Sequence, residues 1–204
     1  MKLNAKQLRD VKEEDITEKL KTIKRRPIYF ILENIYDTYN IGGLFRLADA
    51  LAIEKMYICG QSEIPPNSKI KKASIGTYKV VPWTYKKTAK EAIEELRSGV
   101  IARIRQLAET KQSQKEIATA TTSPRDDNNI VQIIAVEQHL TSIPYQKAGY
   151  SLPLALIFGN ETYGVTEETL KLCDKIVEIP MWGINKSLNV IVSAAIISYW
   201  VVNK

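Results

Sequence analysis

The sequence has 204 residues, 45% of them hydrophobic, which is enough to bury a substantial core and excludes a disordered chain. Its 29 Lys and Arg against 23 Asp and Glu give a net charge of +6, which favours a polyanionic partner. Cys59 and Cys173 fit no metal-binding spacing and are expected to be reduced thiols, and the lack of a signal peptide or transmembrane run predicts a cytoplasmic protein without membrane association.

The N-terminal part of the chain is predicted to be helical. Apolar residues recur at helical spacing among charges over residues 1–26, which we interpret as a helical extension. It ends in the basic turn Lys24–Arg26, for which two interpretations are open: a solvated helix end or a contact with nucleic acid. The apolar run Pro27–Leu32 then predicts a strand.

A helix is predicted from about Asn40 to Ala52, after a polar loop over Glu33–Tyr39. A helical wheel gathers its large apolar residues on one side and places Arg46 opposite, beside Gly42 and Gly43. A glycine face lets a backbone or a ligand come close, with one guanidinium pointing at it. A plain surface arginine is the other interpretation.

The next segment is a strand followed by a long loop. Lys55–Cys59 predicts the strand, and residues 60–78 predict the loop. Within it, Lys69, Lys71 and Lys72 form a basic cluster that either binds RNA phosphates or is only solvated.

The chain then alternates again between strand and helix. Lys79–Trp83 predicts a short strand, Thr88–Glu109 a helix that a glycine could break, and Thr110–Asn129 a polar, mobile loop. Ile130–Val136 predicts a buried strand. His139, the single histidine, follows it and is expected to have a structural or surface role.

The last fifty residues contain two short strands, each ending in a polar loop. Leu152–Phe158 runs into Gly159 and Gly164, and Ile176–Ile179 is stopped by a proline. Ser187 is a plausible N-cap for the apolar helix that follows. Strands alternating with helices imply a largely parallel α/β sheet, and loops at the carboxyl ends of neighbouring strands predict a ligand pocket.

Composition and spacing alone name no reaction. One histidine weakens any Ser/His/Asp or Cys/His mechanism, no metal-ligand set is present, and the glycines do not make a full dinucleotide-binding fingerprint. Three ordered motifs do carry a resemblance. Glu33–Ala48 (ENIYDTYNIGGLFRLA), Phe158–Gly164 (FGNETYG) and Ile179–Asn189 (IPMWGINKSLN) resemble the motifs of the SpoU (TrmH) family of RNA 2′-O-ribose methyltransferases, over roughly Pro27 to Val202.

This resemblance implies a doubly wound, mainly parallel α/β domain over residues 27–204 whose C-terminal segment forms a trefoil knot. It also implies S-adenosylmethionine as cofactor, no metal, tRNA or rRNA as substrate, and a homodimer. By the same resemblance, the cofactor would be held by backbone groups around five residues: Val136, Gly159, Ile179, Ser187 and Leu188.

The resemblance assigns the catalytic work to Arg46 aided by Asn40, with Glu161 and Asn189 ordering the site and Ser187 contacting cofactor or substrate. Because a guanidinium does not lose its proton near neutral pH, we expect Arg46 to stabilise the developing alkoxide or bind the RNA phosphate rather than to act as a base. Without a sizeable N-terminal RNA-binding domain, RNA capture would fall on Lys69, Lys71, Lys72 and the N-terminal basic turn, with Arg46 also binding RNA.

Each polar residue of the motifs also has a simpler interpretation. Asn40 and Ser187 could be only helix caps, and Glu161 only a loop residue that satisfies backbone amides. For the whole chain, a non-catalytic RNA-binding module with the same knot, or a methyltransferase acting on a base, stay open as alternatives.

Overall fold

The computed structural model describes residues 3–10, 20, 22–99 and 130–204. These residues contain a sheet with strand order β3-β2-β1-β6-β4-β7-β5, and every neighbouring pair in it is parallel. The strands are β1 (Arg26–Glu33), β2 (Ile53–Cys59), β3 (Trp83–Lys86), β4 (Gln132–Val136), β5 (Ile143–Pro144), β6 (Leu154–Phe158) and β7 (Lys175–Glu178). The predicted mainly parallel α/β sheet is confirmed.

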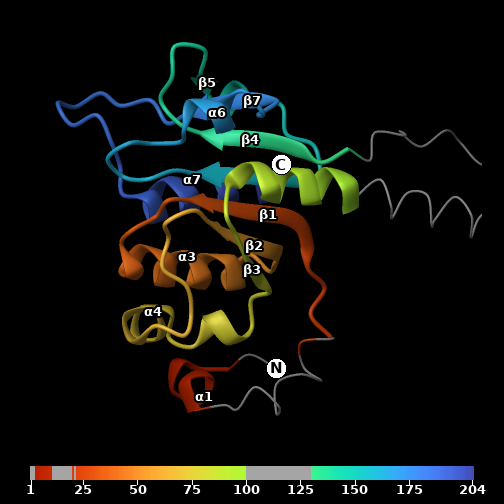
Figure 1. Ribbon diagram of the computed structural model, residues 1–204, viewed down its shortest axis with the longest axis vertical. Coiled ribbons are helices and arrows are strands. Elements are labelled where there is room, and N and C mark those ends of the chain that lie inside the picture. The colour runs from red at the N-terminus through yellow and green to blue at the C-terminus, as the bar shows by residue number, and fades with distance from the viewer. Residues whose placement is uncertain (1–2, 11–19, 21, 100–129) are drawn as a thin grey trace, which may run out of the picture.

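Helices cover both faces of this sheet (Figure 1). The helices are α1 (Ala5–Asp10), α3 (Thr38–Ala50), α4 (Ser68–Ser74), residues 89–99, α6 (Glu167–Leu170) and α7 (Val190–Val202). α3 and α7 pack on one face, and residues 89–99 and α6 pack on the other. The sheet is therefore doubly wound, as predicted.

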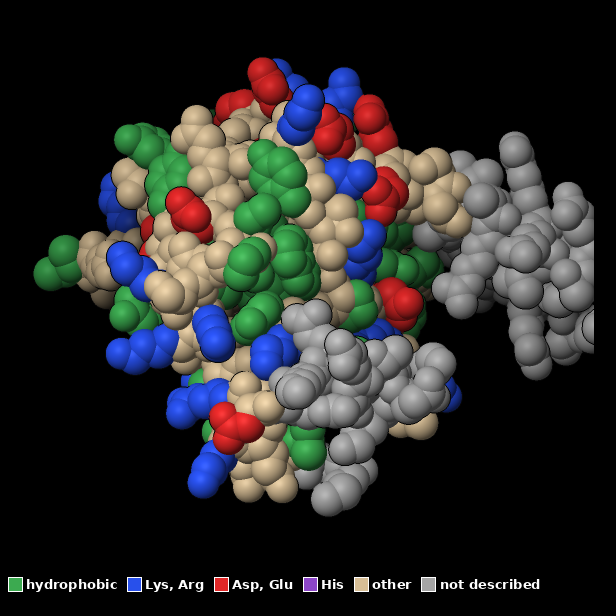
Figure 2. Space-filling model, turned by 60° about the horizontal axis from the view of Figure 1, so that its bottom comes forward, with side chains coloured by type: hydrophobic (Ala, Val, Ile, Leu, Met, Phe, Trp, Pro, Cys, Tyr) green, Lys and Arg blue, Asp and Glu red, His purple; other side chains and the backbone are tan. Residues whose placement is uncertain are grey.

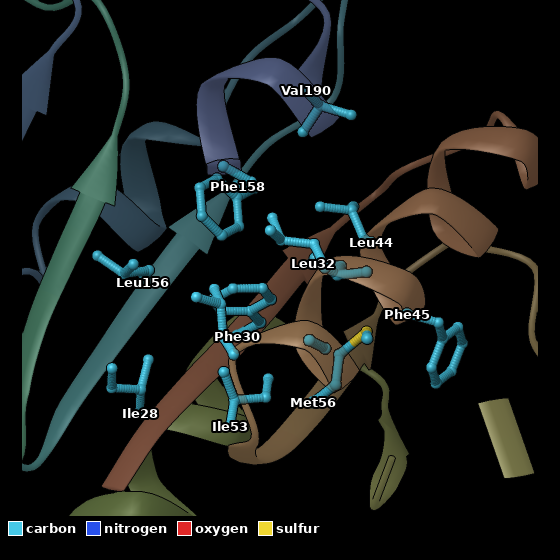
Figure 3. Close-up of a cluster of buried hydrophobic side chains, with 14 of the residues drawn as sticks. Ile28, Phe30, Leu32, Leu44, Phe45, Ile53, Met56, Leu156, Phe158 and Val190 are labelled. Carbon is cyan, nitrogen blue, oxygen red and sulfur yellow. The ribbon is translucent and has the colours of Figure 1, made fainter. Parts of the chain in front are cut away.

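The central strands carry runs of apolar residues because both of their faces are buried. In β1, Phe30 and Leu32 point into the core under α3 and α7, whereas Ile31 points into the core under residues 89–99. Figure 3 shows the first core, where Phe158 of β6 and Val190 of α7 meet the β1 side chains. Phe30 and Phe158 contact edge to face, with ring centroids 5.3 Å apart.

The register aligns the carboxyl ends of the three central strands. Leu32 of β1 and Val136 of β4 both pair with Phe158 of β6. The last residue of β1, Glu33, and the residues that follow β4 and β6, Glu137 and Gly159, therefore emerge at one edge of the sheet.

The two glycines of α3 allow close packing of neighbouring helices. A Cβ atom added to Gly42 would lie 2.5 Å from the Ala73 Cβ of α4, and one added to Gly43 would lie 2.3 Å from the Ile191 Cδ1 of α7. The close approach predicted at this glycine face is thus confirmed, and the neighbours that come close to α3 are the helices α4 and α7.

Several element predictions were wrong. Residues 23–25 are not helical and Arg26 already belongs to β1. Residues 60–78 contain α4, and the strand predicted at Lys79–Trp83 begins only at Trp83, because Thr77–Lys79 form a 3-10 turn. β5 and α6 were not predicted, and the helix predicted to Glu109 and the loop predicted at 110–129 extend into residues outside the described ranges.

Candidate functional site

A cavity of about 270 Å³ opens at the carboxyl ends of β4, β6 and β7. Its walls combine apolar side chains with the polar loops that follow these strands. Its lining includes Val136, Glu137, Gln138, Phe158, Gly159, Asn160, Glu161, Thr162, Tyr163, Gly164, Glu178, Ile179, Met181, Lys186, Ser187, Leu188, Val190 and Ser193. The pocket predicted at this edge of the sheet is therefore present.

All five residues expected to hold the cofactor line this cavity: Val136, Gly159, Ile179, Ser187 and Leu188. They come from the ends of three adjacent strands and from the loop before α7. The Gln138 side-chain amide donates a hydrogen bond to the Lys186 carbonyl at 2.5 Å, which ties that loop to the end of β4.

The loop after β6 is closely folded at Gly159. A Cβ atom there would lie 2.2 Å from the Gly164 carbonyl carbon and 2.3 Å from the Val165 nitrogen. Backbone hydrogen bonds join Asn160 and Gly164 in both directions, at 2.8 and 3.2 Å. The buried Asn160 side chain accepts hydrogen bonds from the amides of Thr162 and Tyr163. Hydrogen bonds within the loop thus fix its conformation.

Two carboxylates that the sequence analysis did not assign to the site fix the same loop from outside. Glu137 accepts from the Val165 amide at 2.8 Å, and buried Glu33 accepts from the Thr166 amide at 2.9 Å and the Thr169 hydroxyl at 2.6 Å. Each glutamate directly ends or follows a buried strand, and this pattern could have identified both from the sequence.

A chain of hydrogen bonds joins the three sequence motifs. Asn40 Nδ2 donates to Glu161 Oε1 at 2.5 Å, and Asn189 Nδ2 donates to Asn40 Oδ1 at 3.0 Å. Asn40 itself is buried, whereas Glu161 and Asn189 are exposed. Because Glu161 also lines the cavity, this link lies at the cavity rim.

The helix caps differ from those predicted. Asp37 caps α3, with its side chain accepting from the Tyr39 amide at 2.8 Å, so Asn40 is free to join the motifs. Asn189, and not Ser187, caps α7 and accepts from the Ile191 amide at 2.9 Å. The interpretations of Asn40 and Ser187 as caps were therefore wrong.

Arg46 is not brought to the cavity of its own chain. It lies six residues beyond Asn40 on α3, roughly 9 Å along the helix axis. Its side chain is exposed and makes no hydrogen bond or ion pair with the residues that the structure describes. Arg46 is thus available for a ligand or another molecule.

Lys69, Lys71 and Lys72 lie on α4, packed beside α3, and all three are exposed. Figure 2 turns the α1 and α4 side of the molecule forward and shows Lys and Arg side chains gathered at its lower left. These exposed lysines make α4 a candidate surface for the polyanionic partner that the net charge favours.

The other titratable candidates do not form a reactive centre. Burial is the main cause that raises the pKa of Cys59 and of Cys173 to about 12 each, so both remain thiols, as predicted. The His139 ring forms a hydrogen bond through Nδ1 with the Thr141 hydroxyl at 2.8 Å, and its Nε2 lies 3.6 Å from the Glu167 carboxylate.

Among the described residues, no group of three or more His, Cys, Asp or Glu side chains could hold a metal ion. Nor does any helix in the described ranges have the length and apolarity needed to cross a bilayer.

Comparison with known proteins bears on this site. The model of the SpoU rRNA methylase family matches residues 27–199. The 23S rRNA (guanosine-2′-O-)-methyltransferase RlmB of Vibrio parahaemolyticus is 27% identical over 192 residues, which are 94% of this chain and 64% of the relative. The tRNA (guanosine(18)-2′-O)-methyltransferase of Thermus thermophilus is 25% identical over 177 residues, 86% of this chain and 75% of the relative.

Solved structures share the fold. The SpoU methyltransferase AviRb from Streptomyces viridochromogenes, solved in complex with AdoMet, superposes with a TM-score of 0.66 at 21% identity, covering 89% of this chain and 59% of that one. The expected fold class, including its C-terminal trefoil knot, is confirmed. The chain spans less than two thirds of the length of several of these relatives.

Proposed function

Since the chain belongs to the SpoU rRNA methylase family, we propose that it transfers a methyl group from S-adenosylmethionine to a ribose 2′-hydroxyl of tRNA or rRNA. The observation that carries this proposal is the hydrogen-bonded link from Glu161 through Asn40 to Asn189 at the rim of the cavity. It joins one polar residue from each of the three motifs, which lie far apart in the sequence.

The cavity fits a nucleoside cofactor. Val136, Phe158, Ile179 and Leu188 provide apolar walls for a flat ring, and the loop backbones provide polar groups at the rim. Gly159 keeps the floor free of a side chain. S-adenosylmethionine, when bound, supplies a methyl group on a positively charged sulfur, which is the chemistry that a ribose oxygen needs.

The chain's own residues would position the ribose. Asn40 uses both ends of its amide, donating to Glu161 and accepting from Asn189, and so fixes both side chains at the rim. Ser187, at the cavity wall, presents a hydroxyl to cofactor or substrate. These residues would orient the 2′-hydroxyl toward the methyl group that the cofactor would supply. The carbon–sulfur bond would break as the oxygen–carbon bond forms, and the hydroxyl proton would pass to solvent water.

Arg46 stabilises the alkoxide that develops as that proton leaves, or holds the adjacent RNA phosphate. We propose a homodimer in which Arg46 of one protomer serves the cavity of its partner, because Arg46 lies outside the cavity of its own chain. α7 supports the dimer: it carries no charge over Val190–Val202, and it leaves Val192 and Tyr199 about half exposed.

RNA phosphates would lie along Lys69, Lys71 and Lys72 on α4, whose ammonium groups are exposed. In the same proposal, residues 27–204 form the catalytic domain, residues 1–26 form an extension, and the protein acts in the cytoplasm, where its RNA substrates lie.

Methyl transfer tests the proposal directly. Transfer from labelled S-adenosylmethionine to tRNA and rRNA is measured for the wild type and for Arg46→Ala, and nuclease mapping of the product separates ribose from base methylation. We expect ribose methylation, and a fall of about 10²–10³-fold in kcat for Arg46→Ala, as for loss of one stabilising donor. Lys171→Ala is the matched control, since this exposed cation follows α6 on the opposite face of the sheet.

Normal transfer by Arg46→Ala would remove the role given to Arg46. RNA binding without any transfer by a wild type that binds the cofactor would favour the non-catalytic RNA-binding module instead.

A further inference from the structure

A second depression, of about 560 Å³, lies between the N-terminal ends of α3 and α4. It is lined by Tyr36, Asp37, Thr38, Tyr39, Glu63, Asn67, Ser68 and Lys69. These residues follow β1 and β2, whereas the first cavity follows β6, β4 and β7, so the two lie along one edge of the sheet. Asn40 directly follows Tyr39, so the polar link begins one residue along α3 from the second depression.

Two aromatic residues line this depression, and both are exposed to solvent. Tyr36 is 46% exposed and Tyr39 is 52% exposed. An exposed ring in a monomer's hollow leaves a flat apolar surface in water, and such a surface is stabilised when another flat ring stacks on it.

Hydrogen bonds and a buried neighbouring residue fix the backbone that carries the two rings. Ile35, next to Tyr36, is fully buried, and its amide donates to the Ser62 hydroxyl at 2.8 Å, which in turn donates to the Cys59 carbonyl at 2.9 Å. The Tyr36 hydroxyl donates to Gln61 at 3.2 Å. Tyr39 lies in the first turn of α3, beside the Asp37 cap. A ligand would therefore meet a surface that is already ordered.

The charge of the depression selects against a phosphate. Asp37 and Glu63 contribute two carboxylates, and Lys69 one ammonium group. Phosphates are better placed on the neighbouring α4 surface, where Lys71 and Lys72 are exposed without carboxylate partners among the described residues. What suits the depression is a neutral, planar group with hydrogen-bond donors, such as a nucleobase.

We propose that Tyr36 and Tyr39 form a stacking platform for a single-stranded nucleobase next to the methylated nucleotide, while the RNA backbone follows the α4 lysines. This inference rests on the proposed function for the identity of the polymer. It assigns to the second depression the recognition of an unpaired base, and hence a substrate site in a loop or bulge rather than within a duplex.

The test compares two probes with the same ribose-phosphate backbone: a short oligoadenylate and an oligomer of equal length without bases. Fluorescence anisotropy at low salt gives both Kd values for the wild type and for Tyr36→Leu/Tyr39→Leu. We expect the wild type to prefer the base-bearing probe by at least about tenfold, and the variant to lose this preference while keeping its affinity for the abasic probe.

Two control variants separate stacking from structure. Tyr36→Phe/Tyr39→Phe keeps both rings and should bind as the wild type does. Tyr85→Leu removes a ring of similar exposure, 42%, on β3 outside the depression, and should leave the preference unchanged.

The proposal is overturned if the wild type binds both probes equally or binds neither, or if the leucine variant keeps the preference. The failure of the proposed function looks different: S-adenosylhomocysteine then fails to bind in calorimetry, or methyl transfer is absent, while the preference for bases persists.

Discussion

At the scale of single residues, Gly159 has no room for a side chain, and the obstacle is backbone. We predict that Gly159→Ala destabilises the protein by about 1–3 kcal/mol, because the loop must move away from the added methyl group. Since Gly159 also lines the cavity, binding of S-adenosylhomocysteine should weaken at the same time. Thermal unfolding and calorimetric titration measure the two effects.

Gly183 provides the matched control. It lies in the loop before α7, and a Cβ atom added there would meet nothing within 4 Å. Gly183→Ala should leave stability and binding unchanged. Equal effects from the two substitutions would show that close packing at Gly159 is not what the cavity depends on.

At the scale of elements, α3 packs closely against α4 at Gly42 and against α7 at Gly43. The atoms that an added side chain would meet differ between the two positions. The Gly42 site is closed by the Ser74 backbone nitrogen, 2.9 Å from an added Cβ, as well as by Ala73, whereas the Gly43 site is closed only by the flexible end of Ile191. We predict that Gly42→Ala lowers the free energy of unfolding by about 1–3 kcal/mol.

Gly43→Ala is the comparison within the same helix. Ile191 can rotate away, and the gain of up to about 1 kcal/mol from replacing glycine in a helix offsets the cost. Its free energy of unfolding, measured by urea denaturation, should therefore stay close to that of the wild type. A loss as large as that of Gly42→Ala would contradict the distinction.

The helix over residues 89–99 is joined to the sheet edge by Glu95, which accepts hydrogen bonds from Lys86, Tyr57 and Lys55. The Lys86 bond, followed by those from Tyr57 and Lys55, lowers the Glu95 pKa from 4.5 to about 2. Because the folded pKa is the lower one, this stabilisation is complete above about pH 4.5 and is lost as pH falls toward about 2.

We predict that Glu95→Gln lowers the free energy of unfolding by about 1 kcal/mol at neutral pH, a value reduced for the 38% exposure of the side chain. Between pH 4.5 and 2 the difference from the wild type should vanish. Urea unfolding across this range measures it. Glu94→Gln, whose exposed partner Lys90 is 3.9 Å away, should change little at any pH.

The elements that could be predicted from the sequence are those with a strong local pattern. β1, β4 and β6 are continuous apolar runs because both faces are buried, and α3 has a clear apolar stripe. β5 has two residues and α6 has four, which is too short for periodicity to show. The strand predicted at Lys79–Trp83 lies at Trp83–Lys86 instead. Its position is set by pairing with β2, a tertiary contact that leaves no local pattern in the sequence.

At the scale of the whole molecule, the proposed dimer can be tested through α7. We predict a mass of twice 23.1 kDa by light scattering for the wild type, and 23.1 kDa for Val192→Glu/Tyr199→Glu, because charge on the exposed apolar face of α7 opposes association. Leu140→Glu is the control: this fully exposed residue lies in the loop after β4, outside α7. A wild-type monomer would remove the dimer.

A dimer with shared sites can also be tested by the activity of mixed dimers. Arg46→Ala and Gly159→Val should each be inactive alone, yet a mixed dimer has one cavity with an intact wall and Arg46 of the partner subunit. Recovery of part of the activity on mixing is expected. No recovery, with mixed dimers demonstrated by mass, would place Arg46 at its own cavity.

The site could be predicted in part. The residues of the cavity wall follow from motif order, since the carboxyl ends of parallel strands meet at one edge. Which polar side chain caps a helix and which reaches across the fold could not, because Asp37 and Asn40, or Ser187 and Asn189, differ only in what tertiary packing brings opposite them. Position relative to a second copy of the chain, as for Arg46, has no signal in one sequence.

The hydrogen bond between Asn189 and Asn40 joins residues 149 positions apart in the chain. During synthesis, the ribosome must therefore release everything up to α7 before the rim of the cavity can close. A nascent chain still attached by its C-terminal segment holds Asn40 and Glu161 without their third partner. A rim built this way is complete only after the segment that contains Asn189 has been translated and released.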